Sequence, residues 1–211
     1  MKNGLDRIVS LGRLKYSDLT SGDTDELENK ITALLGAIDY KTAMQDHRKH
    51  KVYYKQLDPK PDPGIRSLGL EILLNKAEPD KFVSPLSCVM TGDGKLTGYT
   101  MEYIAGRTYT EAIKALKEEG TAYIDTAVGY LRLVKNGLSS LHRKGLYHGD
   151  VWGKNIVITP SNDIKLIDPW YKDDRSRGCQ YDMILVREMY RELLKEQKKE
   201  HNEKLGDDLN F

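Results

Sequence analysis

Hydrophobic positions along the chain change their period near Gly106. Before that residue, apolar side chains come in short runs separated by glycines, charged stretches and a proline-rich segment, which is typical of strands joined by turns. The pattern predicts strands at 31–35, 40–44, 52–57, 82–90 and 95–104. Residues 65–77 interrupt this series, because they carry leucine and isoleucine at helical spacing and predict a helix. A shorter helix is expected near 25–30, at the end of a polar N-terminal stretch.

Beyond Gly106 the apolar positions follow the period of an α-helix. Residues 121–144 predict the clearest amphipathic helix in the chain, because their apolar positions recur at spacings of three and four. Two short apolar runs, 156–158 and 164–167, predict a hairpin, and a last helix is expected from about residue 180 towards residue 200. Strands dominate the first half and helices the second, so an α+β fold is predicted.

Composition limits the kind of protein. The chain has 211 residues, of which 39% are hydrophobic and 31% charged, as in soluble globular proteins. Lysine and arginine number 33 against 32 acidic residues, and the net charge of +1 gives no long-range field that would attract nucleic acid or an anionic membrane. Without a long apolar run or an apolar signal core, the prediction is a soluble, cytoplasmic protein with no membrane partner. Cys88 and Cys179 are predicted to be buried thiols in a reducing compartment.

Three side chains in the second half carry the candidate chemistry. Asp150 closes the loop after the long helix, Asn155 follows five positions later, and Asp168 ends the predicted hairpin. Phosphoryl transfer needs a carboxylate to orient and deprotonate the attacking hydroxyl, and oxygen ligands to hold magnesium on the phosphates. Taken singly, each residue also fits an ordinary role in a turn or at the end of a strand. As a set, they would supply the three groups that phosphoryl transfer needs.

This segment resembles the catalytic loop and the metal-binding acid of the protein-kinase superfamily. The resemblance implies a bilobal protein-kinase-like fold, with a small antiparallel-sheet N-lobe and a truncated helical C-lobe. The implied domains are an N-terminal extension at 1–30, the N-lobe and hinge at 31–104, and the C-lobe at 105–211. In this resemblance Asp150 is the catalytic base, and Asn155 and Asp168 bind the Mg²⁺ or Mn²⁺ that accompanies ATP.

The resemblance also assigns residues that contact the nucleotide from the N-lobe. Lys55, on a predicted strand, would bind the phosphates, and Glu71 on the next helix would form the ion pair that positions it. Gly36 would lie in the phosphate-covering loop, although the family usually has two or three glycines there. The hinge residues that hold the adenine would be Met101, which is also the gatekeeper, Glu102 and Ile104. A surface lysine, a solvated glutamate and a strand-end glycine are the alternative interpretations.

The sequence departs from the kinase pattern in several places. Gly149 replaces the arginine that commonly precedes the catalytic aspartate, so no cation is available there to receive an activation-loop phosphate. Only 13 residues separate Asp168 from Asp182, too few for the usual platform that binds peptide substrates. Pro169-Trp170 replaces the usual Phe-Gly pair. Asp182 is expected either to brace the backbone of the catalytic loop or to be an ordinary acid at a helix N-terminus.

The resemblance implies a minimal serine/threonine-protein kinase that transfers phosphate from ATP to a protein substrate. Its small size and short activation segment resemble effector kinases that bacterial pathogens inject into host cells. The specific hypothesis is a virulence effector of the HopBF family that acts on the host chaperone Hsp90. Such a protein would be secreted into the host cytoplasm and act as a monomer, without nucleic acid or membrane.

Three alternatives stay open. The first is a small-molecule kinase of the aminoglycoside or fructosamine type, because residues 148–152 resemble the catalytic loop of those enzymes. The second is a member of the Bud/RIO group of atypical kinases. The third is a pseudokinase, in which the fold survives as a nucleotide-binding module and no phosphate is transferred.

Overall fold

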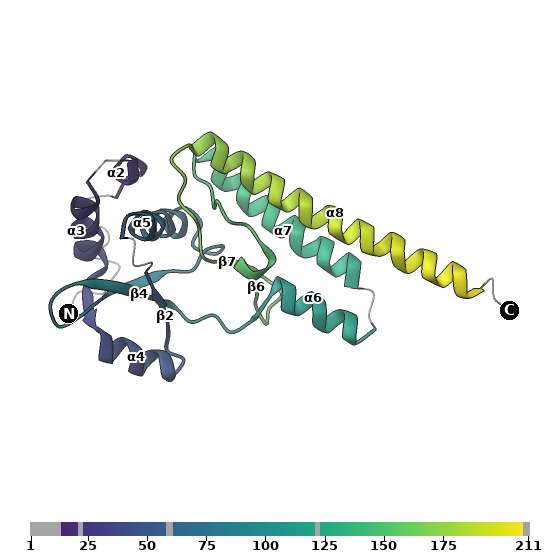
Figure 1. The fold of residues 1–211 in the computed structure, drawn as a ribbon, viewed down its shortest axis with the longest axis horizontal. Helices are drawn as coiled ribbons and strands as arrows, with labels where there is room; N and C mark the ends of the chain where they lie inside the picture. Colours follow the sequence, from purple (N-terminus) through teal and green to yellow (C-terminus); the bar gives the residue numbers. More distant parts are fainter. Residues whose placement is uncertain (1–13, 21–22, 58–60, 121–122, 209–211) are drawn as a thin grey trace. The chain divides into compact units, whose positions relative to one another are not determined.

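The computed structural model describes residues 14–20, 23–57, 61–120 and 123–208 (Figure 1). The chain folds into two compact units. The first consists of Met1–Ile104 and Asp168–Asp173, and the second of Ala105–Ile167 and Asp174–Phe211. Each unit combines helices with a small sheet, so the fold is mixed α+β as predicted.

The first unit is built on a four-stranded sheet with the strand order β1-β3-β4-β2. Its strands are β1 (Ala37–Asp39), β2 (Val52–Gln56), β3 (Pro85–Met90) and β4 (Leu96–Glu102). The predicted hairpin is confirmed as β3–β4, and the predicted strand at 52–57 is confirmed as β2. The β1–β3 pair is parallel, and the β3–β4 and β2–β4 pairs are antiparallel, so the sheet is mixed and the antiparallel sheet implied by the resemblance is wrong at β1. Within the β2–β4 pair, Lys55 lies directly opposite Tyr99, so both side chains leave the same face of the sheet.

Helices surround this sheet within the first unit. Its described helices are α2 (Tyr16–Thr20), α3 (Thr24–Leu35), α4 (Tyr40–Arg48) and α5 (Pro61–Ala77). α5 confirms the helix predicted at 65–77 and packs against α3, with Leu68, Leu70 and Leu74 completely buried. The domain boundary that the sequence predicts after residue 30 falls inside α3.

The strands predicted at 31–35 and 40–44 are wrong, because both segments are helical. The side chain of Asp23 accepts a hydrogen bond from the first turn of α3, and Asp39 does the same for α4. A short apolar run is compatible with a strand and with a helix, and here the aspartate caps decide between them. The helix predicted near 25–30 is confirmed as part of α3.

α4 lies between β1 and β2 in the chain and begins at Tyr40, four residues after Gly36, which the kinase resemblance places in the phosphate-covering loop. It packs against β2, an edge strand of the sheet. The Nδ1 atom of His47 accepts a hydrogen bond from the backbone N–H of Tyr54 at 3.3 Å. The contact satisfies one of the backbone donors that an edge strand leaves exposed.

The second unit combines a three-stranded antiparallel sheet with helices. Its strands, in the order β5-β6-β7, are β5 (Arg107–Thr108), β6 (Ile156–Ile158) and β7 (Ile164–Leu166). Its described helices are α6 (Tyr109–Glu118), α7 (Tyr123–Arg143), the 3₁₀ turn η1 (Gly153–Asn155) and α8 (Arg175–Asp208). The predicted hairpin is confirmed as β6–β7, and the predicted amphipathic helix as α7. The completely buried leucines of α7 are Leu131, Leu138 and Leu141.

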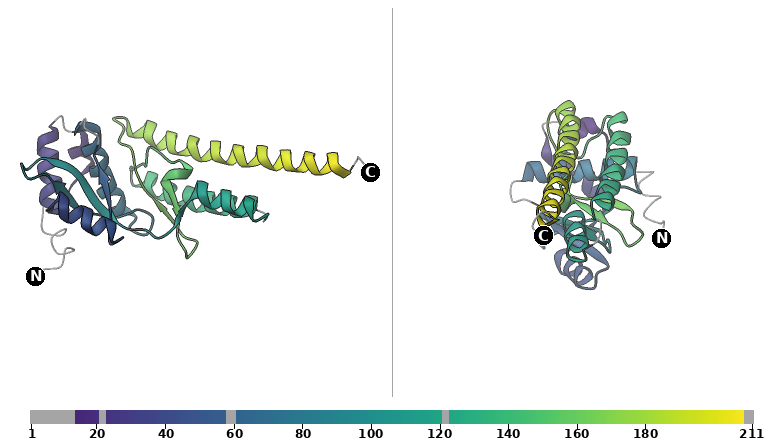
Figure 2. Two further views of the ribbon diagram at one scale, coloured as in Figure 1. Left: turned by 60° about the horizontal axis from the view of Figure 1, so that its bottom comes forward. Right: turned by 90° about the vertical axis from the view of Figure 1, so that its right-hand side faces the viewer.

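α7 and α8 pack side by side in the second unit (Figures 1 and 2). α8 begins at Arg175, several residues before the predicted start, because Asp174 caps it. The Asp174 carboxylate accepts hydrogen bonds from the hydroxyl and backbone N–H of Ser176 and from the backbone N–H of Arg177, and these bonds lower its pKa. The cap starts the helix ahead of its apolar pattern, so the pattern alone places the start too late.

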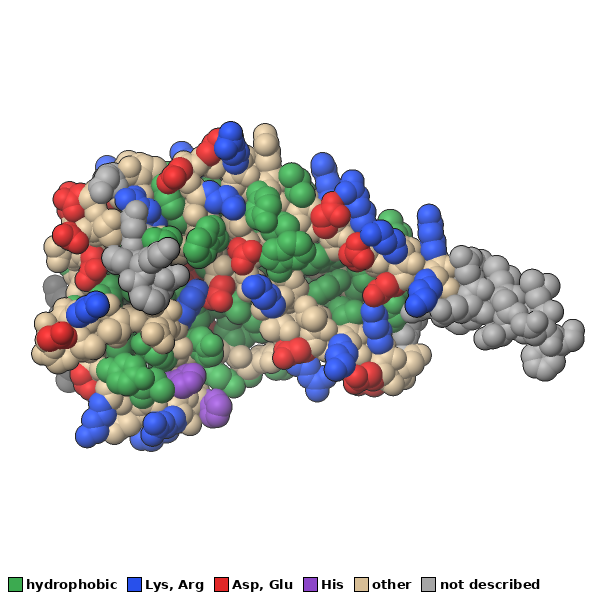
Figure 3. Space-filling view, in the orientation of Figure 1, with side chains coloured by type: hydrophobic (Ala, Val, Ile, Leu, Met, Phe, Trp, Pro, Cys, Tyr) green, Lys and Arg blue, Asp and Glu red, His purple; other side chains and the backbone are tan. Residues whose placement is uncertain are grey.

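The surface charges agree with the composition, and the burial of the two cysteines agrees with the sequence prediction for one of them. Acidic and basic side chains are mixed on the face shown in Figure 3, in keeping with their near-equal totals. Among the described helices, none combines the length and apolar character needed to cross a membrane. Cys88 and Cys179 are free thiols; Cys88 is buried, which raises its pKa to about 11, whereas Cys179 is half-buried. The predicted burial is therefore confirmed for Cys88 alone.

Candidate active site

The loop that follows α7 is held in place from α8. The carboxylate of Asp182 is completely buried and accepts hydrogen bonds from the backbone N–H groups of His148 at 2.8 Å and Gly149 at 2.7 Å. Its Oδ2 atom also lies 2.9 Å from Nε2 of His142. The prediction that Asp182 braces this loop is confirmed, although the residue lies inside α8 and not at its start.

The backbone of the loop explains the glycine that precedes Asp150. Gly149 has a φ of 84°, in the left-handed region, where an arginine would be strained. Beside it, Nε2 of His148 lies 2.9 Å from the carbonyl oxygen of Ile167 and donates to it. Nδ1 of His148 then accepts the backbone N–H of Asp150 at 3.3 Å. These two bonds assign a neutral imidazole to His148 and fix the backbone at Asp150.

Asp150 and Asn155 are joined by hydrogen bonds within the second unit. Nδ2 of Asn155 donates to the backbone carbonyl of Asp150 at 2.9 Å and to Oδ2 of the same residue at 2.7 Å. Asn155 is almost completely buried in η1, and its carbonyl accepts the backbone N–H of Ile167 at 3.0 Å. Neither Oδ1 of Asp150 nor the amide oxygen of Asn155 takes part in these bonds. One carboxylate oxygen and one amide oxygen are therefore left for a substrate or an ion.

Lys55 and Asp168 form an ion pair within the first unit. Nζ of Lys55 lies 2.7 Å from Oδ1 of Asp168. The Lys55 side chain is 26% exposed and the Asp168 side chain 44% exposed, so water screens the pair and other partners can compete for either charge. Asp168 has a φ of 56°, a left-handed conformation that aspartate tolerates better than most residues.

Glu71 lies on α5 and is buried, with 1% of its surface exposed. Its Oε2 atom accepts a hydrogen bond from the hydroxyl of Tyr99, and its Oε1 atom is buried with no hydrogen-bond partner among the described residues. Burial raises the pKa of Glu71 to about 7, and the charge of Lys55 opposes the rise. The resemblance expects Glu71 to pair with Lys55, but the structure pairs Lys55 with Asp168. Tyr99 is a site residue that sequence reasoning missed.

The predicted hinge residues differ in what their backbone already binds. Met101 is buried in β4, and Glu102, at the end of the strand, is exposed and donates its backbone N–H to the carbonyl of Ser84 at 3.0 Å. Ile104 is half-buried, lies beyond the strand, and its backbone makes no hydrogen bond within the part of the chain that the structure describes. Of the three, Ile104 is the residue whose backbone groups remain available to a ligand.

Gly36 has a local structural role. Its φ of 75° is left-handed, as is common for the glycine that ends a helix, and its N–H donates to the carbonyl of Thr32 in α3 at 2.9 Å. Its own carbonyl accepts the backbone N–H of Cys88 at 2.9 Å. Both backbone groups of Gly36 are therefore engaged in joining α3 to the sheet.

The short stretch after Asp168 is anchored within the first unit. The ring of Tyr171 is buried and lies 5.8 Å from the guanidinium carbon of Arg66 on α5. The backbone N–H of Tyr171 donates to the hydroxyl of Ser67 at 3.2 Å, and the hydroxyl of Tyr16 reaches the carbonyl of Lys172 at 3.5 Å. The residues that would form an activation segment are thus packed against α2 and α5.

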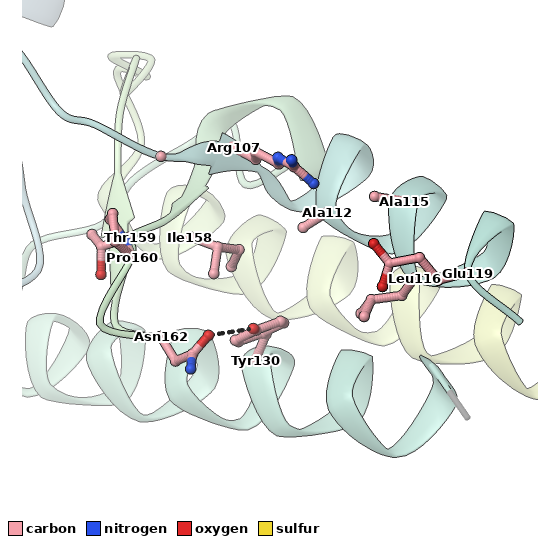
Figure 4. Close-up of a pocket in the computed structure, with 11 residues that line it drawn as sticks. Arg107, Ala112, Ala115, Leu116, Glu119, Tyr130, Ile158, Thr159, Pro160 and Asn162 are labelled. Atoms are coloured by element: carbon pink, nitrogen blue, oxygen red, sulfur yellow. Dashed lines mark hydrogen bonds between the residues drawn. The ribbon is translucent and has the colours of Figure 1, made fainter. Parts of the chain in front are cut away.

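A separate pocket of about 420 Å³ lies within the second unit (Figure 4). It is bounded by α6, α7 and the β6–β7 turn, where the hydroxyl of Tyr130 donates to Oδ1 of Asn162 at 3.1 Å. Its apolar lining comes from Ala112, Ala115, Leu116, Ile158 and Pro160. None of the site residues predicted from the sequence lines this pocket.

Comparison with known proteins gives partial similarities. No protein-family model matches the chain. Serine/threonine-protein kinase PknL of Mycobacterium tuberculosis is 41% identical over 76 residues, which are 36% of this chain and 18% of the relative. The MAP kinase kinase MKK1/SSP32 of Saccharomyces cerevisiae is 29% identical over 100 residues, 46% of this chain and 20% of the relative. The mitogen-activated protein kinase kinase kinase YODA of Arabidopsis thaliana is 31% identical over 112 residues, 53% of this chain and 12% of the relative.

These similarities are limited in extent. The chain covers no more than 20% of the length of any of these three relatives. All three are named as protein kinases, and the mixed α+β character of the two units is compatible with a kinase-like fold. The partial similarities therefore suggest the protein-kinase-like superfamily.

Proposed function

We propose that the chain is a protein-kinase-like enzyme that transfers the terminal phosphate of ATP to a serine or threonine hydroxyl of a protein. The observation that carries this proposal is the bonded pair of Asp150 and Asn155, held in a loop whose backbone is fixed by Asp182 and His148. A positioned carboxylate with one oxygen left over is what the acceptor hydroxyl needs in order to be oriented and deprotonated.

Most of the predicted residues have a role in this proposal, and Gly36 has none. Oδ1 of Asp150 accepts the proton of the attacking hydroxyl, while Oδ2 stays bonded to Asn155. Lys55 binds the phosphates, and the backbone at Ile104 holds the adenine in the hinge that Met101 and Glu102 begin.

The candidate metal ligands fit a hard divalent cation. Asn155 offers an amide oxygen and Asp168 a carboxylate, and both are oxygen donors of the kind that Mg²⁺ and Mn²⁺ prefer. No cluster of three histidine, cysteine or acidic side chains that could hold a metal unaided occurs among the described residues, so phosphate oxygens would have to complete the coordination. When bound, the ion neutralises charge that develops on the transferred phosphate. Asp168 would hold the ion by giving up its bond with Lys55.

The finer assignments stay predictions. The short segment after Asp168 motivates an effector of the HopBF type, with secretion into a host, Hsp90 as the substrate and a monomeric state. A small-molecule acceptor and a pseudokinase are separated from the proposal by experiment.

The test is transfer of radiolabelled phosphate from ATP by the purified full chain, in Mg²⁺ and in Mn²⁺. Acceptors are a cell lysate, purified Hsp90 and an aminoglycoside, so that protein and small-molecule transfer are read in parallel. Asp150→Asn is the inactive reference, and Asp125→Asn, an exposed acid in the first turn of α7, is the matched control. Label in protein that Asp150→Asn abolishes and Asp125→Asn retains supports the proposal. Equal labelling by wild type and Asp150→Asn contradicts it.

A further inference from the structure

Three polar side chains meet inside the first unit without all being satisfied. Lys55 and Tyr99 stand opposite each other on β2 and β4 and leave the same face of the sheet. The Nζ atom of Lys55 lies 5.7 Å from the centre of the Tyr99 ring. Glu71 reaches this group from α5, and its Oε2 atom accepts the Tyr99 hydroxyl.

The unsatisfied member of the group is Glu71. Its Oε1 atom is buried and has no hydrogen-bond partner among the described residues. Leaving a buried carboxyl oxygen unpaired is costly, so such atoms usually have a partner in at least one state of a protein. Lys55 is close enough for its charge to lower the pKa of Glu71, yet it is bonded to Asp168. The cation and the unfilled acceptor are thus neighbours that do not pair in this structure.

We propose that Tyr99 is a positioning residue for the phosphoryl transfer. Its hydroxyl holds Oε2 of Glu71, so that Oε1 stays directed to receive Lys55 when Asp168 binds a divalent ion and releases the lysine. The inference rests on the proposed function and deepens it, because Tyr99 acts through Glu71 and Lys55.

A tyrosine suits this position for a physical reason. The hydroxyl is a neutral donor, so it can hold a carboxylate without neutralising the charge that Lys55 needs as a partner. Burial and the neighbouring Glu71 raise the pKa of the Tyr99 hydroxyl, which keeps the proton on the donor. Phenylalanine would fill the same space but would leave both oxygens of Glu71 without a donor.

The first measurement compares Tyr99→Phe with Tyr54→Phe in a phosphate-transfer assay, with kcat and KM for ATP determined separately. The hydroxyl of Tyr54 makes a single weak bond of 3.4 Å to the carbonyl of Thr97, so Tyr54→Phe is a matched control on the adjacent strand. Loss of a hydrogen bond to a charged group predicts a decrease of about tenfold in kcat/KM for Tyr99→Phe. Tyr54→Phe is expected to stay within about twofold of the wild type. A wild-type rate for Tyr99→Phe would overturn the inference.

A double-mutant cycle separates positioning from general stability. In the Glu71→Gln background the amide still accepts the Tyr99 hydroxyl but cannot take the charge of Lys55. Tyr99→Phe should therefore cause no further loss of activity in Glu71→Gln. An equal loss in both backgrounds would show that Tyr99 matters only for packing, and thermal melts of all four proteins check that each is folded.

A second measurement needs no enzymatic activity. Asp168→Asn removes the charge that holds Lys55, and the acylation rate of Lys55 by acetic anhydride is followed by peptide mass spectrometry, with exposed Lys49 as the internal reference. We expect Lys55 to remain protected in Asp168→Asn, because it moves to Glu71, and to react several-fold faster once Tyr99→Phe is added. Equal rates in the single and double variants would overturn the role of Tyr99. If the wild type transfers no phosphate but Lys55 is still protected in Asp168→Asn and exposed by adding Tyr99→Phe, the proposed function is contradicted and the role of Tyr99 in placing Glu71 is kept.

Discussion

The two groups of candidate catalytic residues differ in how their charges are satisfied. In the second unit, the carboxylate of Asp182 is completely buried and accepts two backbone N–H groups, and Asp150 is bonded to the amide of Asn155. In the first unit, Lys55 and Asp168 form a partly exposed ion pair beside a buried carboxyl with one unpaired oxygen. The loop of the second unit is therefore fixed by its hydrogen bonds. In the first unit, Lys55 has two acidic neighbours, Asp168 and Glu71, and is bonded to only one of them.

The largest expected effect tests the arranged loop. Asp150→Asn should reduce turnover by roughly a hundredfold to ten-thousandfold, the range for a positioned general base, while the affinity for ATP stays nearly unchanged. Transfer assays give the rate, and thermal melts with and without Mg-ATP give binding and stability on the same preparation. A lowered melting temperature together with weaker nucleotide binding would instead assign Asp150 a structural role.

The next largest effect concerns the buried carboxyl of Glu71 in the first unit. The pKa of Glu71 is raised from 4.5 to about 7 by burial, so the folded state binds the proton more tightly than the unfolded state. The stabilisation by this proton is complete below pH 4.5 and is lost as the pH rises through 7, and it amounts to about 3 kcal/mol. Glu71→Gln resembles the protonated form and should match the wild type at pH 4.5 but exceed its stability at pH 8. Urea unfolding at several pH values measures the difference, and a constant difference would contradict it.

The ion pair of the first unit gives a third prediction. Asp168→Ala should remove most of the metal-dependent affinity for ATP, at least about tenfold, because Lys55 alone cannot offset the charge of a triphosphate. Calorimetry with ATP in Mg²⁺ measures the change. Asp173→Ala is the matched control, since Asp173 is an exposed acid of the same short stretch. Unchanged affinity in Asp168→Ala would move the metal site elsewhere.

A smaller effect concerns the backbone of the arranged loop. Gly149→Ala should cost about 1–2 kcal/mol of unfolding free energy, because alanine is strained at a φ of 84°. Gly129→Ala provides the opposite control, since a methyl group there would meet open space on α7 and should stabilise the helix by up to about 1 kcal/mol. Chemical denaturation of both variants separates loop strain from a general effect of added bulk.

The last prediction is that removing phosphate groups from the protein does not change its activity. Gly149, and not an arginine, stands directly before Asp150, and the stretch after Asp168 is packed through Tyr171 against α5, so phosphorylation there is not needed to order it. Phosphatase treatment of the expressed protein should leave the transfer rate unchanged. A loss of activity would show that a phosphorylated residue elsewhere controls the enzyme.

Local patterns predicted the parts of the fold that depend on neighbouring residues. The 3-4 spacing of apolar residues predicted α7, because one face of a long helix must be buried wherever the helix packs. The glycine turn predicted the β3–β4 hairpin. The sequence identified Asp150 and Asn155 as separate candidate residues, and the structure adds that two hydrogen bonds join them. The same approach failed at 31–35 and 40–44, because a run of five residues fits two periods and the deciding caps lie outside it.

The sequence by itself supplied the candidate residues Asp150, Asn155 and Asp168 and the elements on which they lie. Only the tertiary structure decided which partner Lys55 has, because Asp168 lies 113 positions away in the chain. It also decided that Tyr99 bonds to Glu71 and lies opposite Lys55, since that depends on the register of β2 with β4 and on the face that α5 presents to the sheet. Register and docking are set by the packing of the whole unit, and no spacing along the chain encodes them.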